Sequence, residues 1–321
     1  MPKIVLLAPN GQVGFEVARA VAPIGQLSTL SRADVDFADT KSVISKVLAL
    51  QPDVIINAAA YTAVDQAESE PDKAYALNAT LPEMLARLAE ELGAWLVHYS
   101  TDYVYPGDGE RPWSETDETK PLSVYGLSKL AGDEAIQAYC KKHLIFRTSW
   151  VYAARGHNFM RTMLKLAQQR QSLQVVNDQI GAPTPARYIA AVTALALQQI
   201  TAGDKHCAGI YHVSTSGATS WHGFAHEIFR QARQLGMPMA LQQEQCVAIS
   251  SADYPTAARR PANSRLSLRK IEQQFQLQLP DWQSQLALTL QEWSCYQDWF
   301  GCQGSQPVIR TLTTDSNTIK E

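Results

Sequence analysis

The stretch KIVLLAPNGQVGFEVARAV, residues 3–21, decides the fold class of this 321-residue chain. Its opening apolar run is bounded by Pro-Asn-Gly, as expected of a buried parallel strand, and an amphipathic helix follows. Between them lies the spacing of G-x-x-G-x-x-G, with Ala8 in place of the first glycine. Such a turn lets the backbone approach a pyrophosphate at a helix N-terminus. We therefore predict a dinucleotide-binding turn at Gly11, Gln12, Val13 and Gly14.

Strand and helix patterns alternate beyond this turn. Strands are predicted at 26–30, 51–57, 94–99, 143–148 and 209–213, with helices at 40–50, 71–92, 158–171 and 187–200. Regular alternation of this kind favours an α/β fold with a doubly wound parallel sheet of the Rossmann type.

The pattern loosens after residue 150, where segments 174–185 and 250–267 are rich in loop residues and proline. We predict a nucleotide-binding domain over 1–150 and a smaller C-terminal substrate-binding lobe mainly over 151–302. Elements at 157–171 and 187–214 are expected to return to the first domain. Residues 303–321 have little apolar content and are expected to form a disordered tail.

Composition indicates an ordinary globular protein with a small-molecule substrate. The chain is 45% hydrophobic and carries a net charge of −3, which favours neither nucleic acid nor a membrane surface as a partner. The apolar N-terminal run is too short for a signal peptide or a membrane helix, so we expect a cytoplasmic location. Five cysteines without metal-type spacing are expected to be free thiols.

The acid–base candidates lie at Tyr125 and Lys129, which are four residues apart and project from one helix face. A nearby ammonium lowers the pKa of a phenol and so makes proton exchange with a substrate oxygen feasible. A hydroxyl from Ser100 or Thr101, at the end of the preceding strand, is expected to hold the same oxygen. Successive strand residues point in opposite directions, and we favour Thr101.

These motifs resemble the extended short-chain dehydrogenase/reductases. Further strings make the chain similar to one family among them, the dTDP-4-dehydrorhamnose reductases: GQVG (11–14), NAAAYTAVDQAE (57–68), HYSTDYVYPG (98–107), PLSVYGLSKLAGDEA (121–135), FRTSWVYA (146–153), NDQIGAPT (177–184) and ARRPANSRL (258–266). The resemblance covers residues 1–300.

The resemblance implies NADPH-dependent reduction of the C4 ketone of dTDP-4-dehydro-L-rhamnose to dTDP-L-rhamnose, the last step of dTDP-L-rhamnose biosynthesis. Tyr125 would donate the proton, Lys129 would lower the pKa of that tyrosine and hold the nicotinamide ribose, and Thr101 would bind the carbonyl oxygen. Thr62 and Tyr99 are cofactor contacts carried over from the family.

The second strand ends in Ser31 and Arg32, which suit a 2′-phosphate and favour NADPH over NADH, although Arg32 is alternatively a solvated surface charge. Asp36 and Phe37 either flank the adenine, or Asp36 caps the next turn. The small residues Ala58, Ala59 and Ala60 let the backbone pass under the cofactor, or simply end a buried strand.

Four residues are candidates for substrate binding. Asp102 binds the sugar or caps a turn, and Trp150 stacks on the deoxysugar or belongs to the core. Arg259 and Arg260 suit the diphosphate of a nucleotide-sugar, or form surface ion pairs.

Some relatives bind a divalent cation through glutamates at a dimer interface. The matching positions here are Glu16, Glu292 and Arg187, and a guanidinium cannot ligate a cation. We therefore expect no Mg²⁺ site, an Arg187 salt bridge in its place, and a monomer or weak homodimer.

Two other functions remain open from the sequence. An epimerase or dehydratase of the same superfamily is one, although Tyr103 stands where a dehydratase would carry a second carboxylate. A non-catalytic nucleotide-binding regulatory subunit, like the β subunit of methionine adenosyltransferase, is the other.

Overall fold

The computed structural model describes residues 1–203 and 206–301. Its centre is a six-stranded sheet in the order β2-β1-β3-β4-β5-β10, and every pairing in it is parallel. The strands are β1 (Lys3–Leu7), β2 (Gln26–Leu30), β3 (Val54–Asn57), β4 (Trp95–Thr101), β5 (His143–Thr148) and β10 (Gly209–His212). The predicted doubly wound parallel sheet is confirmed.

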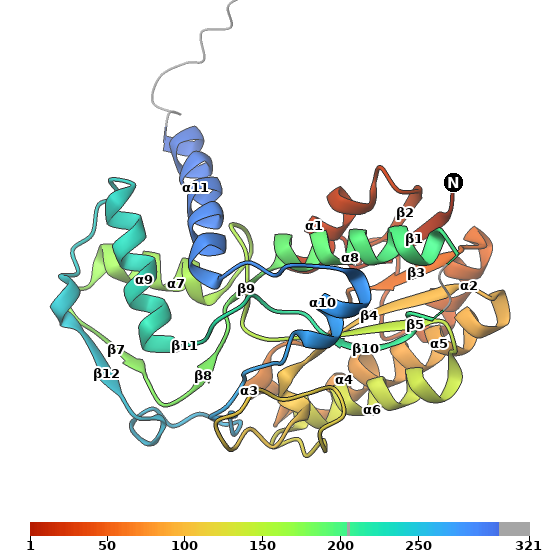
Figure 1. Cartoon of the computed structure of the whole chain (residues 1–321), viewed down its shortest axis with the longest axis horizontal. Helices are drawn as coiled ribbons and strands as arrows, with labels where there is room; N and C mark the ends of the chain where they lie inside the picture. Colours follow the sequence, from red (N-terminus) through yellow and green to blue (C-terminus); the bar gives the residue numbers. More distant parts are fainter. Residues whose placement is uncertain (204–205, 302–321) are drawn as a thin grey trace, which may run out of the picture.

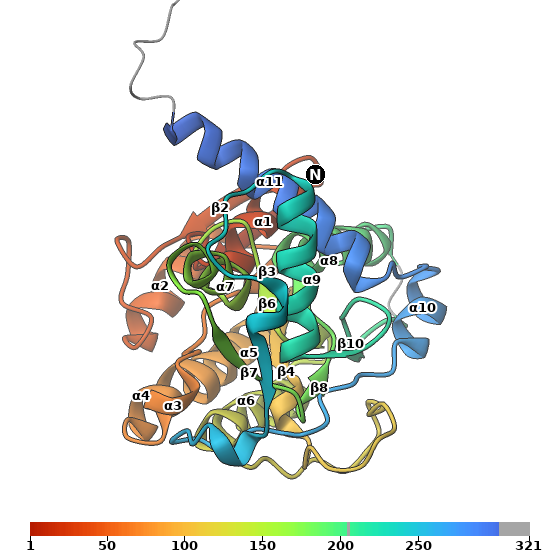
Figure 2. The same cartoon turned by 90° about the vertical axis from the view of Figure 1, so that its left-hand side faces the viewer.

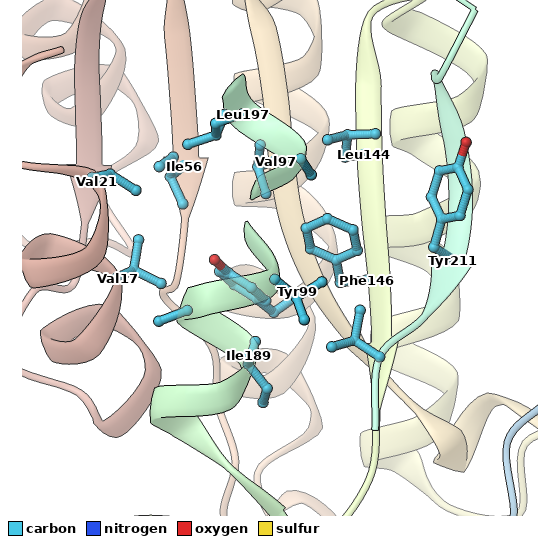
Figure 3. Packing of buried hydrophobic residues seen from close by; sticks show 14 of the residues in the cluster. Val17, Val21, Ile56, Val97, Tyr99, Leu144, Phe146, Ile189, Leu197 and Tyr211 are labelled. Atoms are coloured by element: carbon cyan, nitrogen blue, oxygen red, sulfur yellow. The ribbon is translucent and has the colours of Figure 1, made fainter. Parts of the chain in front are cut away.

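Helices cover both faces of this sheet (Figure 1). On one face lie α1 (Gln12–Val21), α8 (Ala186–Thr201) and the short α10 (Arg269–Phe275), and on the other lie α2 (Thr40–Leu50), α5 (Leu81–Leu92) and α6 (Val124–Tyr139). Figure 3 shows side chains of α1 and α8 packed on strand residues such as Ile56, Val97 and Phe146. Alternate residues of each strand enter opposite cores, and this double burial explains why the strands read as continuous apolar runs.

The predicted helix at 71–92 consists of three pieces: α4 (Pro71–Tyr75), a π-helical turn (Ala76–Thr80) and α5. Pro82 has no N–H to donate to the carbonyl of Asn78. That carbonyl faces Gly132 of α6, where a Cβ would lie only 2.1 Å from it. The proline therefore opens the helix at the point where α6 packs most closely.

A smaller lobe contains α7 (Phe159–Gln169), α9 (Trp221–Gln234) and α11 (Trp282–Gly301), with β7 (Leu173–Val176) paired in parallel to β12 (Cys246–Ile249). Figure 2 views the molecule from the side of this lobe, with α9 and β12 toward the viewer. The prediction that 157–171 returns to the sheet is wrong, because the buried residues of α7 pack with α9 and α11. Helix α8 and strand β10 do join the sheet.

The remaining elements are short. They are α3 (Val64–Ala67), β6 (Val151–Tyr152), β8 (Ile180–Gly181), β9 (Thr184–Pro185), β11 (Thr219–Ser220) and the 3₁₀ turns Asp102–Val104, Gln243–Gln245 and Ser251–Asp253. Within the described ranges no helix is long and apolar enough to cross a membrane. The described cysteines Cys140, Cys207, Cys246 and Cys295 form no disulfide with one another, while Cys302 and the predicted tail at 303–321 lie outside the described residues.

Candidate active site

A cavity of about 800 Å³ lies where the chain crosses from one half of the sheet to the other. The strand order reverses between β1 and β3, so the loops that follow these strands diverge and leave a crevice at their carboxyl ends. Both lobes line the cavity, since Ala8 and Ala58 come from the sheet side while Phe159 and Trp221 come from the smaller lobe.

The turn after β1 forms one end of the cavity. Ala8 has a left-handed φ of 58°, a conformation that glycine adopts without strain, and it stands where the usual motif has its first glycine. Gly11, Gln12 and Val13 line the cavity, and α1 begins at Gln12. Gly14, by contrast, is not among the described lining residues: a Cβ there would lie 2.1 Å from the Ala8 carbonyl oxygen. Its role in this structure is close packing of helix on strand.

The end of β2 contributes Ser31, Arg32 and the buried Phe37 to the cavity. Asp34 folds back onto Ser31 and accepts hydrogen bonds from its backbone N–H at 2.8 Å and its hydroxyl at 2.6 Å. These bonds lower the pKa of Asp34. Asp36 accepts from the N–H of Ala38 at 3.0 Å, so in this structure it has the turn-capping contact.

The segment after β3 passes along the cavity with small side chains. Ala58, Ala59, Ala60 and Thr62 line it, together with Tyr99 from β4. The side-chain oxygen of Asn57 accepts from the N–H of Ala59 at 3.1 Å. That bond fixes the direction in which the amide group of Asn57 points.

Tyr125 and Thr101 meet in the cavity. Ser123 caps α6 by accepting from the N–H of Gly126, which places Tyr125 in the first turn of that helix. Burial raises the pKa of Tyr125, and a hydrogen bond with Thr101 opposes that rise. Ser100 points the other way and donates to the buried Asp133 at 2.9 Å. Lys129 is not among the groups that shift the pKa of Tyr125 in this cofactor-free structure, so the expected lowering stays a prediction.

Lys129 is 1% exposed and turned toward β4. Its Nζ lies 2.7 Å from the carbonyl oxygen of Tyr99, to which it donates, and 2.9 Å from Nε2 of His98. Nδ1 of His98 lies 3.2 Å from the side-chain nitrogen of Asn57. Burial lowers the pKa of Lys129 to about 8, and burial together with the Lys129 charge lowers that of His98.

The direction of these hydrogen bonds follows from Asn57. Its oxygen is occupied by Ala59, so its NH₂ group faces Nδ1 of His98, which must accept. A neutral imidazole then carries its proton on Nε2, facing Lys129. This arrangement suits an uncharged Lys129 amine that accepts from His98. His98 begins the string HYSTDYVYPG, but its contact with Lys129 does not follow from that motif.

Asp102 is 2% exposed and follows Thr101 directly. Its Oδ1 accepts from the Thr101 hydroxyl at 3.1 Å, and its buried Oδ2 has no hydrogen-bond partner among the described atoms. Burial raises the pKa of Asp102 to about 6. It lines the cavity beside Tyr103, whose ring packs edge-on against Tyr125 at 5.5 Å between centroids.

Two tryptophans stack on each other at the smaller lobe. Trp150 and Trp221 lie 3.6 Å apart between ring centroids, with an interplanar angle of 9°, and both line the cavity. Trp150 has a left-handed φ of 50°, and Gly181 leaves the room for its indole, since a Cβ there would lie 2.7 Å from it. The sequence analysis did not identify Trp221, which is 71 residues away from Trp150 and belongs to no motif with it.

Arg260 lines this cavity and also a second, adjoining one of about 1240 Å³, which Arg259 and Trp221 line as well. The guanidinium of Arg260 donates to Asp65 at 2.7 Å, and Asp65 also accepts from the N–H of Ala258. The loop that carries both arginines is thereby tied to the sheet side of the cavity.

Glu16 and Glu292 lie outside the cavity, where α1 meets α11. Arg19 lies 3.9 Å from each of them, and Arg187 lies 3.9 Å from Glu292. Burial and the charge of Glu292 raise the pKa of Glu16. Two guanidinium groups therefore already neutralise these carboxylates.

Comparison with known proteins gives consistent matches. The family model described as the RmlD substrate binding domain matches residues 2–295. The dTDP-4-dehydrorhamnose reductase of Escherichia coli (strain K12) is 51% identical over 284 residues, which are 87% of this chain and 94% of that protein. The enzyme of the same name from Shigella flexneri is 52% identical over the same shares.

Two solved structures of enzymes with that name have folds similar to the fold of this chain. The structure of the dTDP-4-dehydrorhamnose reductase of Clostridium acetobutylicum has a TM-score of 0.82 at 32% identity and covers 91% of this chain and 99% of its own. The Bacillus anthracis enzyme, in complex with NADP, has a TM-score of 0.81 at 32% identity with the same coverage.

Proposed function

This chain belongs to the family of dTDP-4-dehydrorhamnose reductases, within the extended short-chain dehydrogenase/reductases, and from that premise we propose roles for the residues of its cavity. The chain is an oxidoreductase that uses NADPH to reduce the C4 ketone of dTDP-4-dehydro-L-rhamnose to dTDP-L-rhamnose. Membership in this family sets aside the epimerase, dehydratase and regulatory-subunit alternatives. The observation that carries the site assignment is that Thr101, at the end of β4, and Tyr125, in the first turn of α6, line the same crevice.

The residues of the crevice fit NADPH. The amides at the start of α1 and the room left beside Gly11 suit a pyrophosphate, since a Cβ at Gly11 would lie an ordinary 3.5 Å from its nearest neighbour. Arg32 supplies a cation for a 2′-phosphate, and Ser31 is held beside it by Asp34. Ala58, Ala59, Ala60, Thr62 and Tyr99 would form the remaining wall. When bound, NADPH supplies the hydride that the carbonyl carbon receives.

Tyr125 would provide the proton. A phenol whose pKa is raised by burial stays protonated at neutral pH, which is the state that a reduction requires of its acid. Thr101 would hold the carbonyl oxygen beside the phenol. In the substrate-free structure the Thr101 hydroxyl donates its one proton to Asp102 at 3.1 Å, so it would turn from Asp102 to the carbonyl oxygen when substrate binds. We assign to Asp102 the role of holding the Thr101 hydroxyl before substrate binds, in addition to the predicted contact with the sugar.

Lys129 would hold the nicotinamide ribose and replenish the proton of Tyr125. Its lowered pKa, about 8, lets it exchange a proton near neutral pH. His98 would orient the Lys129 amine by a direct hydrogen bond, and Asn57 would in turn hold the His98 ring. The remaining hydrogen-bonding capacity of the amine would serve the ribose.

The substrate would lie between the two lobes. The Trp150–Trp221 stack walls the cavity where the deoxysugar must lie if its C4 is to reach Tyr125. Arg259 and Arg260 would bind the diphosphate, and the second cavity would receive the nucleoside. We propose that Arg19 and Arg187 replace a divalent cation beside Glu16 and Glu292, and that the chain is a monomer or a weak homodimer.

The test follows the near-ultraviolet absorbance of NADPH, and of NADH in parallel, with enzymatically prepared dTDP-4-dehydro-L-rhamnose. We expect NADPH to be the preferred cofactor and Tyr125→Phe to slow its oxidation by about 10²–10⁴-fold, as for loss of a general acid. Tyr139→Phe, at the exposed end of the same helix, is the matched control and should retain the activity. Full activity of Tyr125→Phe would refute the assignment of the acid.

A further inference from the structure

Three metal-ligand side chains gather in the smaller lobe, away from the reduction site. His222 and His226 lie one turn apart on α9, and Cys246 begins β12. Their ligand atoms all lie within 4.8 Å of one another. Among the described residues, none of the three lines either of the two cavities considered above.

The fold brings these side chains together from separate elements. His222 and His226 lie at the edge of the buried face of α9, beside Phe229, which is seven residues from His222 and three from His226, and both rings are near the start of β12. Nε2 of His222 lies 3.0 Å and Nε2 of His226 lies 3.4 Å from the same acceptor, the carbonyl oxygen of Cys246. Both imidazoles therefore point at one spot, with ring centroids 4.5 Å apart.

The third donor is a thiol in the same place. Cys246 is 5% exposed, and without a cation beside it burial raises its pKa, which keeps the sulfur protonated. A bound divalent metal would supply that missing positive charge and hold the sulfur deprotonated.

We propose that His222, His226 and Cys246 form a site for a borderline-soft divalent metal, with Zn²⁺ as the natural occupant. Two imidazoles and one thiolate suit Zn²⁺ and exclude hard cations such as Mg²⁺ or Ca²⁺. Tetrahedral zinc with ordinary bond lengths places its ligand atoms about 3.3–3.6 Å apart, so the three side chains close in by about 1 Å on binding. Water occupies the fourth position.

Such a metal would tie α9 to β12. β12 leads into the segment that carries Arg259 and Arg260, so the metal stabilises the framework on which the second cavity is built. This metal would take no part in the reduction, because its three ligands do not line the crevice. Failure of this proposal therefore leaves the assignment of the reduction site intact.

The experiment titrates the whole chain, freed of metal by a chelator, with Co²⁺ as a spectroscopic probe. We expect one equivalent to bind and to produce tetrahedral d–d bands together with a thiolate-to-cobalt charge-transfer band, both removed by added Zn²⁺. Cys246→Ser should abolish the charge-transfer band. His226→Gln should weaken binding by at least about 100-fold, beyond the 10–100-fold that loss of an outer-shell partner costs.

The matched control combines Cys295→Ser with Cys302→Ser. It removes the exposed thiol of Cys295 and the next cysteine along the chain. This double variant should keep the band. Metal-free melting temperatures and circular dichroism establish that each variant is folded, and Zn²⁺ should raise the melting temperature of the wild type but not of His226→Gln. Absence of the band in the wild type, its survival in Cys246→Ser, or its loss in the control would each overturn the proposal.

Discussion

Lys129 offers the sharpest test of the electrostatics of this site, through the variant Lys129→Met. The side chain is 1% exposed, and burial lowers its pKa from 10.5 to about 8. When folding lowers the pKa of a lysine, protonation of that lysine below about pH 8 reduces the free energy of unfolding, because the unfolded chain binds the proton more tightly. The contribution of Lys129 to the free energy of unfolding therefore increases as the pH increases from about 8 towards 10.5.

The magnitude follows from the two pKa values. With about 1.4 kcal/mol per pKa unit, the cost of charging Lys129 is about 3 kcal/mol at about pH 7 and about 1 kcal/mol at about pH 9.5. Methionine has a similar shape and no charge, so it removes this pH-dependent part. The hydrogen bonds lost at His98 and at the Tyr99 carbonyl add a further offset to the difference between wild type and variant.

The assay is urea unfolding of wild type and Lys129→Met at both pH values. We expect the wild type to gain about 2 kcal/mol relative to the variant on going from about pH 7 to about pH 9.5. Ionisation of buried tyrosines is common to both proteins and cancels. Lys165→Met, at an exposed position of α7, should show no such change. A difference that stays constant with pH would refute the inference that Lys129 is desolvated and titrates near 8.

Three further predictions test other contacts. Arg32→Ala should raise KM for NADPH by about 10–100-fold and leave KM for NADH nearly unchanged, because one charged hydrogen bond to the phosphate is lost; equal effects on both cofactors would contradict the assignment. Gly14→Ala should lower the urea midpoint of the cofactor-free protein strongly while Gly11→Ala changes it little, since the added Cβ lies 2.1 Å from the Ala8 oxygen in one case and 3.5 Å in the other. Arg147 forms a buried ion pair with Asp133 at 3.0 Å, and Arg111 forms one with Asp117 in which the arginine is exposed. Arg147→Met should cost about 3–5 kcal/mol by leaving the buried Asp133 without its cation, whereas Arg111→Met should cost less than about 1 kcal/mol in the same unfolding experiment. Similar losses in the two variants would show that burial of the ion pair is unimportant.

Local sequence patterns predicted the sheet well because each strand is buried on both faces and each crossover helix is amphipathic. The strand Lys3–Leu7, the turn at Gly11 and the capped start of α6 depend on neighbours within a few residues. The same holds for the joint placement of Thr101 and Tyr125, since one ends a parallel strand and the other begins the helix above that edge. The helix at 158–171 was assigned to the wrong lobe because its apolar stripe does not say which core it will enter.

Sequence by itself determined the fold class of this protein and predicted a nucleotide-binding turn and an acid–base pair, because chain-local geometry and strand alternation place those residues. Tertiary structure alone decided which side chains from distant segments share a site: the Trp150–Trp221 stack, the contact of His98 with Lys129, and the meeting of His222 and His226 with Cys246. It also decided the protonation of the site, since burial raises the pKa of Tyr125 and lowers that of Lys129. Desolvation depends on everything packed around a group, and no spacing along the chain encodes it.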